Sequence, residues 1–435
     1  MNANNRFLKA ASFLILIACS GARITLANIS VDLLGVGSFA GDAFDTSGFS
    51  GNLEDGTPKN RMGGFGSAIA YTGIDNRYVA VPDRGPADGG TSYVDRYYEI
   101  NLAIQGGSVT ASLLNTTLLS NGAGQNYTGS SAAFDASNST SSLRLDPEGI
   151  RVAHNGHLFV SDEYGPFVYE FNRQGERVRT FDVPDKFKIA NPSATANNEL
   201  PPGNTSGRQV NRGMEGLAIS PDGSKLFGIM QNALIQDNAL DASNGRVGLN
   251  NRILEIDIAT GQTKEYVYQI TSKSLGVNEI VAVNSHEFLV IERDGKAGSD
   301  AAVKNIYWID IAGATDVSAV AVLPKGALPP GIVPVQKTLL LDLLDPEFNL
   351  AGASFPEKIE GLAFGPDLFD GRHLLWVTND NDFNSLRPSN FYAFAVNASA
   401  LPDYEKQQFV PEPSTLLLFG GALAGLGFLR KRKAA

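Results

Sequence analysis

Four short stretches of the chain share a glutamate at a matching position, just ahead of a strand-like apolar run. The glutamates are Glu148, Glu215, Glu279 and Glu360, and they stand 67, 64 and 81 residues apart. This spacing suits four-stranded propeller blades joined by long connections. The innermost strands of a propeller surround a central channel, so residues at equivalent positions converge there. We therefore expect these carboxylates to form an acidic ring at the channel.

An acidic ring of this kind predicts a cation site. Clustered carboxylates repel one another unless a cation or protons neutralise them. Ca²⁺ takes six to eight oxygen ligands in loose geometry, which suits such a ring. Asp162 follows the strand after the first glutamate and is predicted to join the four glutamates as a metal ligand. The alternative is that some glutamates only accept hydrogen bonds from neighbouring strand ends.

Charged residues after the next strand of a repeat are candidates for catalysis. They are Arg84, Glu163 and Arg293. A guanidinium beside a carboxylate-bound cation can hold a phosphate or carboxylate oxygen through bidentate hydrogen bonds. The chain has no Gly-x-Ser-x-Gly elbow and no cysteine paired with a histidine, so metal-activated water is the expected nucleophile and a carboxylate the general base. For each arginine the alternative is an ordinary salt bridge with the adjacent acid.

The composition narrows the classes of partner. Of the 435 residues 43% are hydrophobic and 19% charged, so a sizeable core is expected. The net charge of −11 argues against nucleic acid and anionic membrane as partners of the body, since both require basic surfaces. Cys19 is the only cysteine, and the four histidines are scattered, so a carboxylate-bound hard cation is favoured over zinc.

The body of the chain, residues 28–402, is predicted to be all-β. Short β-rich runs recur between turn signals, and no long amphipathic helix interrupts them. A fifth unit without an acid occurs near Phe65, which stands where the others have glutamate. Five recognisable units leave room for a sixth, so we expect a six-bladed β-propeller. Residues 29–37 are expected to pair with residues 391–396 and close the ring, which would remove exposed sheet edges.

The first residues follow the pattern of a secretory signal peptide. Arg6 and Lys9 precede an apolar stretch, and small residues end a cleavage candidate at Ala27. We expect residues 1–27 to be removed by signal peptidase and the protein to be exported. The alternative is lipidation of Cys19, because the residues before it resemble a bacterial lipobox.

The last residues, 403–435, form a second targeting segment. Pro411-Glu412-Pro413 leads into an apolar run at about 415–429, and a basic cluster follows it. The run is short for a transmembrane helix, and its basic end is expected to stay cytoplasmic. This tail resembles the PEP-CTERM sorting signal of bacterial exosortase substrates. The resemblance implies transient membrane insertion, cleavage by an exosortase, and release or attachment at the cell surface, in the periplasm or outside the cell. The alternative is a retained C-terminal anchor.

The body itself resembles the phytase-like family described as having esterase-like activity of phytase. The similar stretches are residues 65–85, 146–166, 171–176, 211–217, 279–294 and 358–362. The resemblance implies a secreted β-propeller that hydrolyses phosphoric or carboxylic esters. The chain has no dense lysine-rich run that would cradle a hexakisphosphate, so inositol hexakisphosphate is not the expected substrate.

Three functions are compatible with these features. The first is a Ca²⁺-dependent hydrolase of a small phosphate or related ester at the channel mouth. The second is a non-catalytic surface propeller that uses calcium for rigidity and binds extracellular polysaccharide matrix or protein. The third is a lactonase-like propeller hydrolase that would share the metal.

Overall fold

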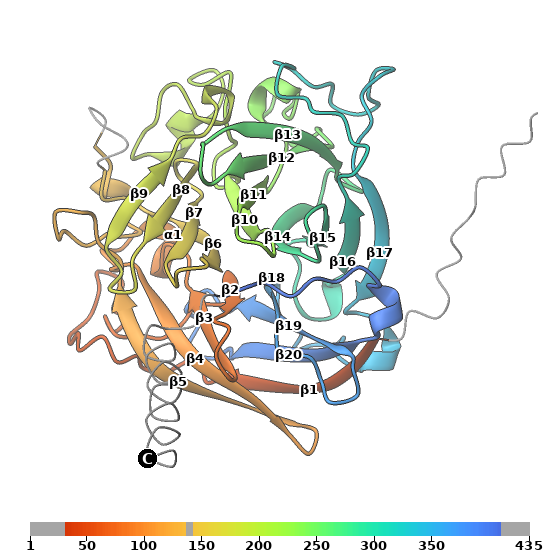
Figure 1. Ribbon diagram of the computed structural model, residues 1–435. Helices are drawn as coiled ribbons and strands as arrows, with labels where there is room; N and C mark the ends of the chain where they lie inside the picture. The colour runs from red at the N-terminus through yellow and green to blue at the C-terminus, as the bar shows by residue number, and fades with distance from the viewer. Residues whose placement is uncertain (1–30, 136–141, 410–435) are drawn as a thin grey trace, which may run out of the picture.

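Five four-stranded antiparallel sheets stand around a central channel in the computed structural model, which describes residues 31–135 and 142–409 (Figure 1). The first sheet holds β2 (Ala68–Tyr71), β3 (Arg77–Val81), β4 (Arg96–Gln105) and β5 (Ser108–Leu118). The second holds β6 (Pro147–Val152), β7 (Leu158–Asp162), β8 (Phe167–Phe171) and β9 (Arg177–Phe181). The third holds β10 (Met214–Ile219), β11 (Lys225–Met230), β12 (Asn250–Asp257) and β13 (Thr263–Gln269). The fourth holds β14 (Gly276–Ala282), β15 (Glu287–Arg293), β16 (Lys304–Asp310) and β17 (Gln336–Asp342).

The fifth sheet joins the two ends of the described chain. It holds β18 (Lys358–Phe364), β19 (His373–Asp380), β20 (Ser389–Val396) and β1 (Val31–Phe39). β1 pairs antiparallel with β20, from Val31 opposite Val396 to Phe39 opposite Ser389. The predicted closure of the ring is therefore confirmed, and it gives the last blade its outer strand from the start of the body.

The architecture is an all-β propeller, as predicted, but the six-blade count was wrong. The described residues build five blades, and the length assigned to a sixth is used by long connections such as residues 182–213 and 311–335. Only single turns of helix lie in the described connections: α1 (Pro86–Gly89) and the 3₁₀ turns Ser131–Ala133, Asp185–Phe187, Ala196–Glu199, Ile235–Asp237, Gly298–Asp300, Pro346–Phe348 and Ala398–Ala400.

The hydrophobic core is divided among the five blade-to-blade interfaces. Each of five large buried clusters draws its residues mainly from two adjacent sheets. Trp376 of the last blade donates its indole N–H to Tyr78 Oη of the first blade at 2.8 Å, across the closure. Because apolar side chains hold the blades to each other, the inner strands β2, β6, β10, β14 and β18 are free to present polar groups to the channel.

Candidate functional site

A β-bulge lies at the start of each of four inner strands and leaves one residue of that strand outside the regular pairing. The pairing register shifts between Pro147 and Gly149, Met214 and Gly216, Val277 and Glu279, and Ile359 and Gly361. The extra residues are Glu148, Glu215, Asn278 and Glu360. A bulge leaves its extra residue outside the ladder and re-aims its side chain. These four residues form one layer at one end of the channel, which we call the acidic mouth.

The fifth blade-start position belongs to Ser67 rather than Phe65. Gly361 faces the Ile69 side chain, and Gly216 faces the Ile280 backbone. Because Ile280 stands two residues after the bulged Asn278, the residue two before Ile69, which is Ser67, is in register with the bulged residues. Phe65 instead packs in the core against Phe39, with ring centroids 5.5 Å apart. The prediction that Phe65 matches the glutamates was therefore wrong by two residues, because the glycines around Phe65 obscure the position of the repeat.

Glu279 lies one residue deeper in the channel than the other three glutamates. It pairs with Arg151 Nη2 at 3.0 Å and accepts the backbone N–H groups of Leu217 and Ile280. Burial raises the pKa of Glu279 to about 8, against the lowering effect of Arg151. Arg151 also donates to the carbonyls of Ile69 at 3.0 Å and Ile280 at 2.7 Å. This pair therefore ties the four inner strands β2, β6, β10 and β14 together and divides the channel into two ends.

The acidic mouth opens into a cavity of about 200 Å³. Its charged and amide lining residues are Asp83, Arg84, Glu148, Glu163, Asn211, Arg212, Glu215, Gln231, Arg246, Asn278, Arg293, Glu357, Lys358 and Glu360. All five blades contribute to this set, the first through Asp83 and Arg84, which follow β3. The blade repeat thus brings together acids and bases that are far apart in the sequence.

Amide side chains hold the glutamates of this cavity on one side only. Asn278 Nδ2 donates to Glu215 Oε1 at 2.6 Å and to Glu360 Oε1 at 3.3 Å. Gln231 Nε2 also donates to Glu215 Oε1, at 2.5 Å. Glu215 Oε2 and Asn278 Oδ1 are buried and have no hydrogen-bond partner. An unpartnered buried oxygen is costly, so two of them beside further carboxylates fit the ligand preference of a hard cation.

Burial and mutual repulsion shift the titration of Glu148 and Glu215. Burial, followed by the charges of Glu215 and Asp146, raises the pKa of Glu148 well above its usual range. Burial, followed by Glu163 and Glu360, raises the pKa of Glu215 in the same way. A bound cation would reverse both effects, since opposite charge favours the ionised carboxylate.

A second group of three acids touches the same cavity. Asp146, Glu148 and Glu163 each offer an oxygen, and these atoms lie within 4.8 Å of one another. Asp146 is already engaged by Arg84, through its backbone N–H at 3.0 Å and Nη1 at 2.7 Å. Glu163 Oε1 accepts the Gly213 N–H at 3.0 Å, and its Oε2 lies 3.7 Å from Arg84 Nη1. Glu148 and Glu163 are therefore the members that remain open to the cavity.

The predicted arginines both line the cavity, and each has a carboxylate partner. Arg84 bonds Asp146 and Asp88, and Arg293 Nη2 bonds Glu360. The predicted ligand Asp162 lies outside the cavity lining, where its carboxylate accepts backbone N–H groups of the surrounding turn. The structure thus brings together Glu148, Glu163, Glu215, Glu360, Arg84 and Arg293, and it leaves out Asp162 and Glu279.

Sequence reasoning missed Asn278, Gln231, Arg212, Arg246 and Lys358 in this site. Asn278 was within reach, because it adjoins Glu279 in the repeat. Lys358 Nζ lies 2.8 Å from Asp380 and 3.7 Å from Asp83 and also pairs with Asp382. Asp83, Asp380 and Asp382 therefore form a separate group of three acids that shares the ammonium group of Lys358, which distinguishes it from the acids around Glu148.

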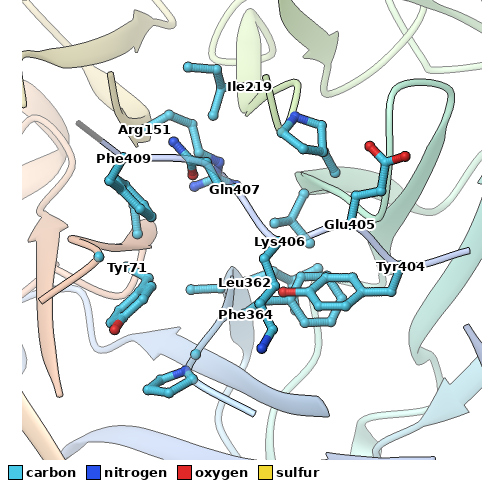
Figure 2. Close-up of a pocket in the computed structure, with 18 of the residues that line it drawn as sticks. Tyr71, Arg151, Ile219, Leu362, Phe364, Tyr404, Glu405, Lys406, Gln407 and Phe409 are labelled. Atoms are coloured by element: carbon cyan, nitrogen blue, oxygen red, sulfur yellow. The ribbon is translucent and has the colours of Figure 1, made fainter. Parts of the chain in front are cut away.

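The other end of the channel is crossed by residues 401–409, which we call the C-terminal strap (Figure 2). Glu405 N–H bonds the Val283 carbonyl, and Gln408 N–H bonds the Pro221 carbonyl, both at 2.8 Å. Phe409 packs edge-on against Tyr71, with ring centroids 5.9 Å apart. A cavity of about 440 Å³ remains beside the strap, and we call this end the strapped mouth.

The fold and the cavity at the acidic mouth define a five-bladed propeller with a charged site at one end of its channel. The chain belongs to the phytase-like family, described as "Esterase-like activity of phytase", whose model matches residues 60–383. The PEP-CTERM protein-sorting motif matches residues 409–433. Both resemblances seen in the sequence are thereby confirmed.

A curated relative supports export. An uncharacterized secreted protein of Arthroderma benhamiae is 28% identical over 340 residues, which cover 61% of this chain and 64% of the relative. The chain thus spans less than two thirds of that protein's length. Together with the sorting motif, the likeness supports an exported, surface-sorted protein. The predicted signal peptide, Cys19 and the apolar run at 415–429 lie outside the described residues, among which no helix is long and apolar enough to cross a membrane.

Two solved structures are similar over most of the chain at low identity. An exo-β-1,3-galactanase from Phanerochaete chrysosporium is 12% identical with a TM-score of 0.41, covering 86% of this chain and 66% of that one. A gluconolactonase from Xanthomonas campestris is 10% identical with a TM-score of 0.33, covering 85% and 91%. Likeness of this strength carries no information on activity.

Proposed function

We propose that this protein is an exported, calcium-dependent ester hydrolase whose active site is the acidic mouth. The observation that carries the proposal is the pair of buried, unpartnered oxygens, Glu215 Oε2 and Asn278 Oδ1, inside a cluster of carboxylates. The membership in a family described by esterase-like activity supports the hydrolytic part. Glu148 and Glu360 complete a set of oxygen ligands from four different blades.

The residues around the proposed ligands divide the remaining tasks. Bound Ca²⁺ would polarise the ester as a Lewis acid. Glu163 is placed as general base, because its carboxylate borders Glu148 and is oriented by the Gly213 N–H. Arg84 Nη1 lies 3.7 Å from Glu163 Oε2 and helps to orient this carboxylate, and Arg293 fixes Glu360. In the four-glutamate set predicted from the sequence, Asn278 replaces Glu279, and Asp162 has a structural role in its turn.

Hydrolysis of generic phosphomonoester, phosphodiester, carboxylester and sugar-lactone substrates tests the proposal. We expect turnover of at least one class, its loss on chelation and its recovery with Ca²⁺. The Glu163→Gln variant should retain calcium binding and lose about 10²- to 10⁴-fold in kcat, the usual contribution of a general base. Glu405→Gln, at the strapped mouth, is the matched control and should be unchanged. Calcium binding without turnover of any substrate would contradict the enzymatic role.

A second candidate is a non-catalytic, calcium-stabilised propeller that binds extracellular matrix. The PEP-CTERM motif favours it, because a surface-sorted protein can act through its loops alone. The two candidates differ in the same assay. A matrix-binding propeller would gain thermal stability from Ca²⁺ and hydrolyse none of the four substrate classes, whereas the enzyme would gain stability and also hydrolyse at least one of them.

A further inference from the structure

Two neighbouring guanidinium groups in the acidic-mouth cavity have no carboxylate partner. Arg212 Nη1 bonds Gln231 Oε1 and lies 3.0 Å from Asn232 Oδ1. Arg246 Nη1 bonds the same Asn232 Oδ1 at 3.3 Å and the Leu275 carbonyl at 3.4 Å. Within residues 31–135 and 142–409, neither arginine forms a salt bridge. Since one oxygen accepts from both, the two positive groups are held side by side.

The other basic groups of this cavity are all neutralised. Arg84, Arg293 and Lys358 each pair with at least one carboxylate. Arg212 and Arg246 are instead positioned by amide and carbonyl oxygens, which accept hydrogen bonds without cancelling charge. Glu163 and Glu215 attract Arg212 through space. Among the described residues, however, no carboxylate forms an ion pair with Arg212 or Arg246, so this region of the cavity holds two guanidinium groups that are fixed by neutral oxygens alone.

Two adjacent guanidiniums without an acid repel each other. Burial, followed by the neighbouring Arg212, lowers the pKa of Arg246 to about 10. An anion placed between them would remove this repulsion and accept charge-assisted hydrogen bonds from both. The planar donor fork of arginine matches the oxygen geometry of phosphate and carboxylate groups.

A single side chain links this pair to the proposed metal ligands. Gln231 accepts a hydrogen bond from Arg212 through Oε1 and donates one to Glu215 through Nε2. A group bound by Arg212 thus lies within one glutamine side chain of the acidic ring. It is close enough to belong to the same small molecule as an ester held at Glu148 and Glu163.

We propose that Arg212 and Arg246 form an anion subsite, and that the substrate is an ester bearing a phosphate or carboxylate group. This deepens the proposed function and rests on it. It also reassigns anion recognition from Arg84 and Arg293, whose charges are already neutralised by carboxylates. The two arginines act as binding residues that select charged over neutral esters.

Anion binding measured without turnover tests the subsite independently of catalysis. Titration of the calcium-loaded full chain with inorganic phosphate, and separately with acetate, should show binding of at least one anion. Arg212→Gln and Arg246→Gln should each weaken it about 10- to 100-fold, since each removes a charged hydrogen bond. Arg246→Lys should restore part of the affinity, because it returns the charge without the fork. Arg77→Gln, an exposed surface variant, should bind as the unaltered protein does.

The outcomes separate this proposal from the hydrolase proposal. Anion binding that depends on both arginines, with no ester turned over, would support the subsite and contradict the hydrolase. Hydrolysis of a neutral ester with no binding of either anion would do the reverse. If esters are hydrolysed, both variants should raise KM for an anionic ester at least tenfold and leave kcat and the KM of its neutral analogue unchanged. Equal losses on both substrates in well-folded variants would overturn the subsite.

Discussion

The two mouths of the channel are built from the same inner strands and differ in almost every chemical respect. At the acidic mouth, bulged residues place carboxylates and an amide into a cavity that basic groups surround. At the strapped mouth, aromatic side chains and the C-terminal strap cover the strand ends (Figure 2). The buried pair of Arg151 and Glu279 separates them. One end of the channel is therefore organised for chemistry and the other for closure.

The position along each strand explains this division. Bulges re-aim side chains at the strand starts, where charge can gather around a ligand. Further along, regular pairing resumes, and small or apolar residues such as Ala218 and Leu362 occupy the strands. Polar function at one end of a propeller channel thus requires a closed, well-satisfied layer beneath it.

The largest effect is expected from breaking the divider between the mouths. Arg151→Met leaves Glu279 buried without its partner and should lower the free energy of unfolding by about 3–5 kcal/mol. Denaturant unfolding measures this. The double variant with Glu279→Gln should recover part of the loss, because a buried amide does not depend on a charged partner. A single variant within about 1 kcal/mol of the unaltered protein would show that the pair does not tie the strands together.

A smaller effect is expected at the strapped mouth. Tyr404 packs against Phe364 and His373, with ring centroids 4.5 and 4.3 Å apart. Tyr404→Ala should therefore cost about 1–3 kcal/mol of stability while calcium affinity stays the same. Thermal unfolding with and without Ca²⁺ distinguishes the two quantities. A loss of calcium affinity in this variant would mean that the two mouths are coupled rather than separate.

A third comparison is the pH dependence of the stability of the metal-free protein, which should have opposite signs at the two mouths. Burial raises the pKa of Asp83 in the acidic mouth to about 7. The stability that Asp83 contributes is therefore present below about pH 4 and is lost as the pH rises through 7. At the strapped mouth, burial tends to raise the pKa of Asp367. Hydrogen bonds from His373 and Lys406 outweigh burial and lower this pKa. The stability that Asp367 contributes is therefore present above about pH 4 and is lost at more acidic pH.

Two isosteric variants separate these contributions. Asp83→Asn should flatten the decline in melting temperature between about pH 4 and 7, and Asp367→Asn should flatten the decline below about pH 4. If Asp83→Asn instead flattened the decline below about pH 4, and Asp367→Asn the decline between about pH 4 and 7, the charge environments assigned to the two mouths would be wrong.

Much of the fold and part of the site could be predicted from the sequence. Glu148, Glu215 and Glu360 were placed on inner strands because their repeat is regular, and the closure by residues 29–37 followed from the need to cover an edge. The number of blades could not be predicted from the sequence. A chain of this length can hold either six blades with short connections or five blades with long ones. Asn278 was missed because a bulge decides which of two adjacent polar residues enters the channel.

The arginine pair could not have been predicted at all. Arg212 and Arg246 matter because neither forms an ion pair with a carboxylate among the described residues, and this is a property of the assembled cavity. In the sequence, each looks like any other arginine near a strand end. Arg84 and Arg293, which stand directly beside acids in the sequence, proved to be neutralised by acids from elsewhere in the fold.

Calorimetric titration of the purified protein with Ca²⁺ tests whether the acidic mouth binds calcium, with Glu215→Gln compared against Glu405→Gln. We expect one site in the unaltered protein, affinity at least tenfold weaker in Glu215→Gln, and no change in Glu405→Gln at the strapped mouth. Equal calcium binding by all three proteins, or none by the unaltered protein, would contradict the assignment of the acidic mouth as a calcium site.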